Sequence, residues 1–165
     1  MEELKLDADG ERNNRMEQKG SGVGLFRTCV TLMNTGSTPV TVTLPAGLMF
    51  VSSDLDHQNG ILLTPVTVTI GVKSPARFLL NGYCLNPARK VSGYNHTYTM
   101  GPVTQNPHLK QLIGLIGNKE LQVLPDGNAA DRTGFLKMSR LQKLTDRITL
   151  DGQLSASEWA EVKSF

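Results

Sequence analysis

Apolar and polar residues alternate in short runs over the first two thirds of the chain. The runs 40–44 (VTVTL) and 66–70 (VTVTI) alternate at every position, as expected for strands with one buried and one solvated face. Turn-forming Gly, Pro and Asn residues separate them from other apolar stretches. Further strands are expected over 23–32, 48–51, 61–63, 78–80 and 83–85, with a turn at Asn81-Gly82. This pattern predicts a mainly β protein with an antiparallel β-sandwich over residues 21–104.

Helical periodicity replaces the alternation in the C-terminal part. Apolar residues share one face of a helix expected over 107–116, and spacings of three and four predict a second helix over 135–148. Ser155 and Glu158 have the spacing of a capping box, which predicts a short third helix. A short strand is also expected over 121–124. We therefore expect residues 105–165 to form a small helical segment, packed on the sandwich or appended to it.

The first twenty residues mix charged and amide side chains with few large apolar ones. Such a segment cannot offset its ordering entropy by burial, so residues 1–20 are expected to form a mobile polar tail. The segment has no apolar signal core, and no run in the chain reaches the roughly 18 apolar residues that a membrane span needs. As written, the chain is expected to be soluble, or secreted or in the cell envelope if an N-terminal signal is missing from it.

Charge and motifs narrow the functional classes. Seventeen basic and fifteen acidic residues give a formal charge of +2, which does not indicate nucleic-acid binding. We find no Ser-His-Asp arrangement, phosphate-binding glycine loop, paired-carboxylate site or two-cysteine metal clip. A non-enzymatic protein without a cofactor is therefore expected. Cys29 and Cys84 could form one bridge between strands in an oxidising compartment if the topology brings them together.

One candidate metal site lies near the C-terminus. Residues 151–158 resemble the second half of an EF-hand calcium loop, with Asp151 and Gly152 at the bend and Glu158 at the closing position. This resemblance implies that Asp151 and Glu158 are calcium ligands. The alternative is a capped turn between two helices without an ion, because a capping box also accounts for Ser155 and Glu158.

A second candidate site involves Cys84. The stretch 81–86 (NGYCLN), with its Tyr83-Cys84 pair, resembles the Tyr-Cys element of thioester domains from bacterial surface adhesins, and Gln142 on a later helix is similar to the glutamine of that family. The resemblance implies that the Cys84 thiol displaces ammonia from the Gln142 side chain. The product would be an electrophile that an amine of a partner attacks.

A third hypothesis is a copper site. Cys84, His96 and Met100 occur in the order used by the cupredoxins, a family of blue-copper sandwiches that this order resembles, with His57 as an early ligand. The alternative is that these histidines are solvated residues of polar loops.

The leading functional hypothesis needs none of these chemistries. A rigid β-sandwich that presents the loops 52–60 and 86–107 would be a recognition or cell-surface module for an unknown protein or glycan ligand. The second loop holds residue types suited to contact surfaces, and we predict these as binding residues: Tyr94, His96, Tyr98 and Met100. Covalent adhesion through Cys84 and metal binding remain the alternatives.

Overall fold

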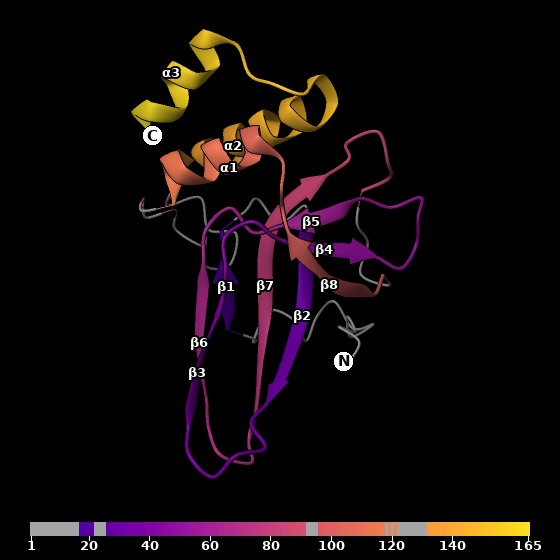
Figure 1. Ribbon diagram of the computed structural model, residues 1–165, viewed down its shortest axis with the longest axis vertical. Helices are drawn as coiled ribbons and strands as arrows, with labels where there is room; N and C mark the ends of the chain where they lie inside the picture. Colours follow the sequence, from indigo (N-terminus) through magenta and orange to yellow (C-terminus); the bar gives the residue numbers. More distant parts are fainter. Residues whose placement is uncertain (1–16, 22–25, 92–95, 118, 120, 122–131) are drawn as a thin grey trace.

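The computed structural model describes residues 17–21, 26–91, 96–117, 119, 121 and 132–165. Within these residues the strands come first and the helices follow (Figure 1), in the order β1 (Gln18–Gly20), β2 (Phe26–Met33), β3 (Val40–Leu44), β4 (Leu48–Ser52), β5 (Asn59–Ile61), β6 (Val66–Ile70), β7 (Pro75–Leu85), β8 (Tyr98–Val103), α1 (Pro107–Ile116), α2 (Arg132–Asp151) and α3 (Ala156–Ser164). The prediction of a mainly β protein with a helical C-terminal part is confirmed.

The longest strand, β7, organises the larger sheet. This sheet has the order β1-β7-β5-β4-β8, and β2 also pairs with β7. The pairs are antiparallel except for β1 and β7, which run parallel. The predicted tail 1–20 therefore contains a strand at Gln18–Gly20, whereas residues 1–16 lie outside the described residues.

The predicted turn at Asn81-Gly82 is wrong, because β7 continues through both residues. The Asn81 side chain lies between two neighbouring strands, where its Oδ1 accepts from Arg27 and its Nδ2 donates to Gln18. Gly82 lies under the Phe26 ring, where a Cβ atom would be only 3.0 Å from that ring and 2.7 Å from the Ile61 carbonyl oxygen. Asn and Gly are common in turns, but in β7 the Asn81 side chain bonds two neighbouring strands and Gly82 leaves room for the Phe26 ring.

The second sheet is formed by β3 and β6, which pair antiparallel from Val40↔Ile70 to Leu44↔Val66. These are the two runs with strict alternation, and both strands have the predicted bounds. On the exposed side, Thr41 bonds Thr69 at 3.3 Å and Thr43 bonds Thr67 at 3.0 Å through their hydroxyl groups. Cross-strand threonine pairs of this kind stabilise a two-stranded sheet.

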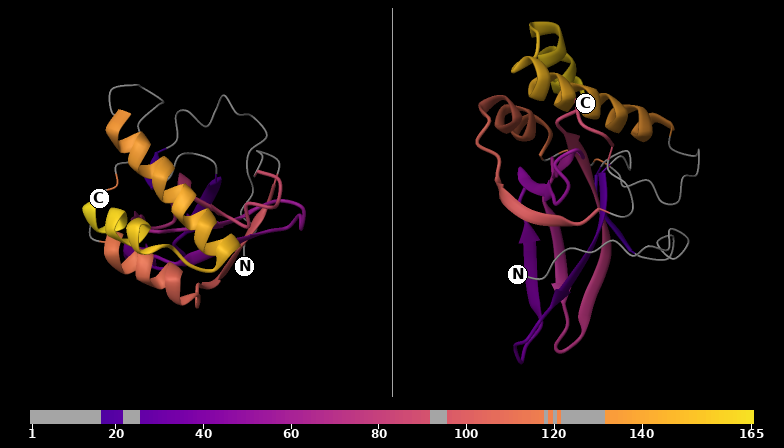
Figure 2. Two further views of the ribbon diagram at one scale, coloured as in Figure 1. Left: turned by 90° about the horizontal axis from the view of Figure 1, so that it is seen from above. Right: turned by 90° about the vertical axis from the view of Figure 1, so that its right-hand side faces the viewer.

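Two apolar clusters hold the elements together. The first, which we call the sheet core, contains residues from both sheets: Phe26, Val30, Leu44, Leu48, Phe50, Leu62, Val66, Val68, Ile70, Phe78, Leu80, Cys84 and Tyr98. The second, the helix core, joins the larger sheet and the strand-end residue Leu63 to all three helices: Ile61, Leu63, Tyr83, Leu85, Leu109, Leu112, Ile116, Leu141, Leu144, Ile148, Leu154 and Val162. The helices are thus packed on the β part and cover one end of it (Figure 2).

The helix ends follow their sequence signals. Asn106 caps α1 by accepting from His108 N and Leu109 N, with Pro107 in the first turn. Ser155 and Glu158 form the complete capping box predicted for α3. None of the helices in the described part combines the length and apolar character that crossing a bilayer requires.

The predicted loop 86–107 contains a strand. Residues Tyr98–Val103 form β8, which pairs with β4, with a register shift between Leu48 and Phe50. The Gly101-Pro102 pair hides this strand from pattern analysis, since both residues usually mark turns. Most of the predicted strand 121–124 lies outside the described residues.

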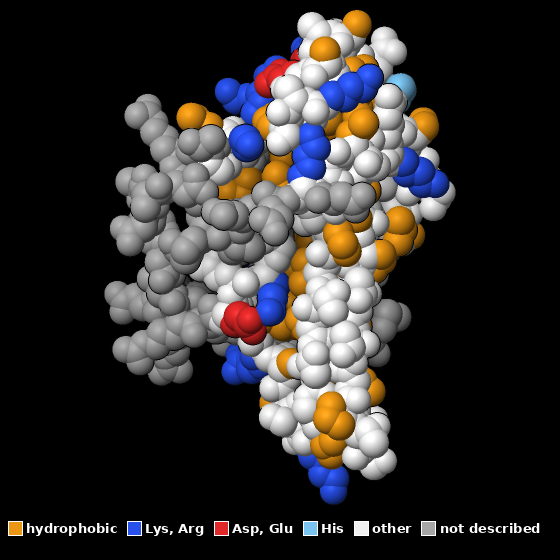
Figure 3. Space-filling view, turned by 90° about the vertical axis from the view of Figure 1, so that its left-hand side faces the viewer, with side chains coloured by type: hydrophobic (Ala, Val, Ile, Leu, Met, Phe, Trp, Pro, Cys, Tyr) orange, Lys and Arg blue, Asp and Glu red, His pale blue; other side chains and the backbone are white. Residues whose placement is uncertain are grey.

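On the face shown in Figure 3, the Lys and Arg side chains are spread from one end to the other and do not form one basic patch.

Candidate functional site

Cys84 and Gln142, 58 residues apart in the chain, are in direct contact. Gln142 Oε1 accepts a hydrogen bond of 2.9 Å from the Cys84 backbone N–H, and Gln142 Nε2 donates one of 3.1 Å to the Cys84 carbonyl oxygen. Nε2 also donates to Asp146 Oδ1 at 2.9 Å. Both residues are buried, with 2% of Cys84 and 4% of Gln142 exposed. The structure thus brings together the two residues of the predicted thioester.

The Gln142 carboxamide bonds the edge of β7 beyond the point where β2 stops pairing with it. The pairing of β2 with β7 ends at Phe26↔Gly82, two residues before Cys84. In a strand the N–H and C=O of one residue point toward the same edge, so a single carboxamide can bond both groups. This contact attaches the middle of α2 to β7.

Neighbouring residues of β7 face opposite sides. Tyr83 and Leu85 belong to the helix core, whereas Cys84 belongs to the sheet core. Burial raises the pKa of the Tyr83 hydroxyl well above its usual value, so this side chain is neutral. The Tyr-Cys pair therefore joins the two cores at the point where Gln142 reaches the strand.

Asp146 was not among the predicted site residues. It lies one helical turn after Gln142, on the same side of α2, and it is partly buried. Burial raises the pKa of its carboxyl group, although the hydrogen bond from Gln142 opposes this shift. An acid of raised pKa beside the Gln142 nitrogen is a suitable group for proton transfer to that nitrogen. The spacing of four residues on a helix was the only sequence signal for it.

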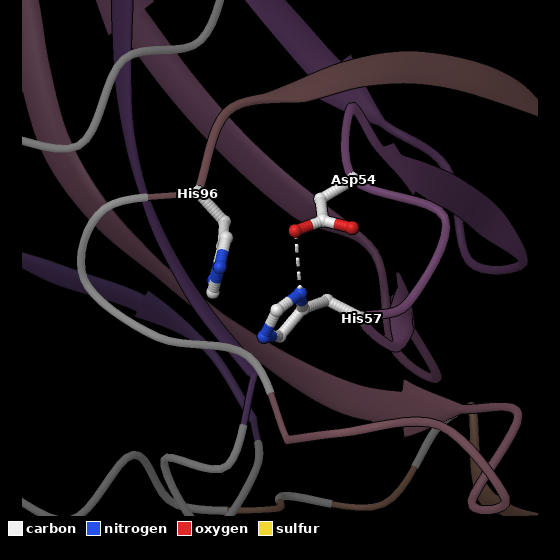
Figure 4. Close-up of side chains that lie close together, drawn as sticks. All are labelled: Asp54, His57 and His96. Atoms are coloured by element: carbon white, nitrogen blue, oxygen red, sulfur yellow. Dashed lines mark ion pairs between the residues drawn. The ribbon is translucent and has the colours of Figure 1, made fainter.

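A second group of polar side chains lies where the loop after β4 meets the segment before β8. The ligand atoms of Asp54, His57 and His96 all lie within 4.8 Å of one another, and Figure 4 shows the three side chains converging. The rings of His57 and His96 have centroids 3.7 Å apart. The His57 Nδ1 atom lies 2.9 Å from Asp54 Oδ2.

The predicted copper ligands are only partly brought together. His57 and His96 are neighbours, but Cys84 is not in their group. Met100 lies in β8 and is 43% exposed. Asp54 is the member that the sequence analysis missed, and its place three residues before His57 in a polar turn was the available signal. Tyr94 lies outside the described residues.

Tyr98 is not exposed in a binding loop, as the sequence analysis predicted. Its side chain is fully buried in the sheet core, with its ring perpendicular to Phe26 at 5.0 Å between centroids. Position 98 begins β8, and the strand turns this residue inward. Tyr98 is thus a core residue, not part of an exposed contact surface.

The carboxylates of Asp151 and Glu158 face a common cation, which is Arg147. Arg147 Nη1 lies 3.0 Å from Asp151 Oδ2, and Arg147 Nε lies 3.6 Å from Glu158 Oε1. The hydrogen bonds of the capping box, and then Arg147, lower the pKa of Glu158. This geometry is that of a capped turn between helices and adds no support to the calcium hypothesis.

Cys29 and Cys84 are both buried, and no disulfide joins them. Cys29 lies opposite Leu79 of β7, and Cys84 is five residues further along that strand, which corresponds to about 16 Å at the usual rise. A disulfide needs Cα atoms within roughly 7 Å. The topology therefore does not bring the two cysteines together, and the bridge that the sequence left open does not form in this structure.

Comparison of the chain with protein-family models, with curated proteins and with solved structures finds no match.

Proposed function

We propose that this chain is a β-sandwich adhesion module that forms an internal thioester between Cys84 and Gln142 and captures an amine of its partner covalently. The observation that carries the proposal is the double hydrogen bond between the Gln142 carboxamide and the Cys84 backbone. Two residues of the types that this chemistry needs, 58 residues apart in the chain, meet in a buried site.

One hydrogen bond of Gln142 favours thioester formation. The Cys84 N–H polarises the side-chain carbonyl through Oε1 and would stabilise the negative charge that develops there during attack. The thiol is on the same residue as this donor, so a change of the Cys84 rotamer would bring the nucleophile toward the carbonyl group. Burial keeps water away from the product.

The proposed reaction has two steps. First, Cys84 Sγ bonds to Gln142 Cδ, the Cδ–Nε2 bond breaks, and the thiol proton leaves on ammonia, with Asp146 as the proton relay. Second, a partner's amine bonds to Cδ, the Cδ–Sγ bond breaks, and the proton of the amine returns to Sγ. Neither step consumes an oxidant or a cofactor, and the amide product is stable.

The Cys84 side chain must change its orientation before it can react with Gln142. Cys84 packs in the sheet core, whereas Gln142 approaches from the edge of β7. The first step therefore needs a Cys84 rotamer in which Sγ turns toward that edge. Rotamer changes of a small side chain cost little compared with the gain in effective concentration.

Intact mass spectrometry of freshly purified, non-reduced protein tests the proposal. The expected mass is below the sequence mass by one ammonia, and methylamine should convert it to the methylamide with release of a free thiol. Cys84→Ala and Gln142→Ala should each have their full sequence mass. Cys29→Ala, which removes the other buried cysteine, should keep the deficit.

A full sequence mass for the unmodified protein, together with two thiols that react after denaturation, would overturn the covalent proposal. Recognition without a covalent bond is then the function that the structure supports. It is favoured by the meeting of two segments, the loop after β4 and the residues before β8, at His57 and His96.

A further inference from the structure

The proposed thioester chemistry makes no use of Asp54, His57 and His96, which we call the histidine cluster. These residues include two of the three histidines of the chain. They come from two segments that are more than 35 residues apart in sequence. Such a meeting of donor atoms needs its own explanation.

The backbone around the cluster is fixed by hydrogen bonds. Ser53 N donates to the Thr97 carbonyl oxygen at 2.9 Å, and the two hydroxyl groups of these residues lie 2.6 Å apart. This pairing places the adjacent residues Asp54 and His96 side by side. On the other side, Gln58 N donates to the Lys90 carbonyl oxygen at 2.9 Å. The side chains of the cluster thus sit on a preorganised scaffold.

Asp54 and His57 hold two potential metal ligands close together. His57 Nδ1 is a buried atom and lies 2.9 Å from Asp54 Oδ2. In one tautomer the imidazole donates its Nδ1 proton to this carboxylate, and in the other both atoms present lone pairs that a shared cation can bind. Donors around a metal ion with bonds of about 2.0–2.1 Å are separated by roughly 3 Å.

The charge of Asp54 also suits a cation. The Asp56 N–H donates to Asp54 Oδ1 at 2.9 Å and fixes the orientation of the carboxylate. An aspartate side chain carries a negative charge at neutral pH. The Asp54 side chain is 46% exposed, so the cluster is open to solvent.

We propose that Asp54, His57 and His96 bind a divalent transition-metal ion of the zinc class. Two imidazoles and one carboxylate favour Zn²⁺ or Cu²⁺ over Ca²⁺ and Mg²⁺, which prefer oxygen ligands. Three protein ligands leave a coordination position for water or for a carboxylate or imidazole of a partner. The ion would also join the loop after β4 to the segment before β8.

Calorimetric titration of the full-length, tag-free chain with Zn²⁺ tests the inference, and Co²⁺ absorption reports the ligand set. We expect one ion per chain. His96→Gln, His57→Gln and Asp54→Asn should each weaken binding at least about tenfold. His108→Gln, which changes the histidine outside the cluster, should bind as the unmodified protein does.

The same titration separates this site from the thioester. Cys84→Ala should keep full Zn²⁺ affinity, because Cys84 is not in the cluster. Unchanged binding in both His57→Gln and His96→Gln, no binding by the unmodified chain, or tighter binding of Ca²⁺ than of Zn²⁺ would overturn the inference. Thermal unfolding without metal checks that each variant is folded, and Asp54→Asn serves if a histidine variant is not.

Discussion

Two buried amide side chains, Asn34 and Gln142, bond main-chain groups where strand pairing stops. Asn34 Nδ2 donates to the carbonyl oxygens of Thr38 and Ile70, at the ends of β2 and β6. Gln142 bonds both main-chain groups of Cys84. A buried polar residue of this kind is stable only when its partners are in place. The sequence does not show these partners, because they depend on the tertiary arrangement.

Gln142→Ala therefore has a consequence for stability beyond any covalent chemistry. The change removes the hydrogen bonds of Gln142 to the buried N–H and C=O of Cys84, and the loss of such a bond costs about 1–3 kcal/mol for each group. We expect a loss of at least about 2 kcal/mol in the free energy of unfolding, measured by denaturant titration under reducing conditions. Gln111→Ala on the exposed face of α1 is the control and should change stability little. Equal effects in the two variants would mean that the contact contributes nothing.

The strands and helices that could be predicted are those whose own residues carry a sequence pattern. The strict alternation of β3 and β6 and the caps of α1 and α3 give their positions directly. By contrast, β8 contains Gly101-Pro102 and depends on β4 for its pairing. β1 is short and polar, and it pairs only because β7 supplies an edge. Tertiary pairing overrides local propensity in these strands.

One ion pair between α2 and α3, Arg140–Glu161, has a pH dependence that can be predicted. Arg140 Nε and Nη2 each bond Glu161 at 2.7 Å, and this contact lowers the pKa of Glu161 below its usual 4.5. The lower pKa belongs to the folded state, so the stabilisation is complete above about pH 4.5 and is lost as the pH falls through the folded pKa.

Thermal unfolding between acidic and neutral pH would show this effect. Glu161→Gln should be less stable than the unmodified protein at neutral pH, by at most about 1 kcal/mol because the pair is partly solvated. The two proteins should become equally stable in acid. A constant difference across the pH range would show that Glu161 acts through packing and not through its charge.

At the scale of the whole molecule, the two cores share the larger sheet. Ile61, Tyr83 and Leu85 are buried under the helices, while their strand neighbours face the sheet core. The division into a β domain 21–104 and a helical segment 105–165 describes the order of elements along the chain. It does not describe two independent units, since among the described residues the helices cover an apolar face of the β part.

A truncation at residue 104 tests this dependence. Removing the helices would expose the sheet side of the helix core, at a cost of several kcal/mol of lost apolar burial. We expect the fragment 1–104 to lack cooperative unfolding and to bind a hydrophobic dye, and we expect the helical segment added in trans to reverse this only in part. Cooperative unfolding of the fragment alone would show that the sheet core is sufficient.

The sequence identified residues of the candidate sites, but it did not show how these residues are arranged in space. The resemblance selected Cys84 and Gln142, and the structure brings them together, but Asp146 became visible only in three dimensions. The copper hypothesis selected His57 and His96 for one site, although the third member of their cluster is Asp54 and not Cys84. Sequence order identifies residue types suited to a chemistry, whereas loop pairing decides which of them meet.

The separation between Cys84 and Gln142 also sets a time order during synthesis. The edge of β7 at Cys84 has no access to its amide partner until 58 more residues have been made. A Cys84 thiol in a nascent chain thus meets its carboxamide only after the strands have formed and α2 has docked. Formation of a reactive bond would then be restricted to molecules that have finished folding, and an incomplete chain would carry an ordinary thiol.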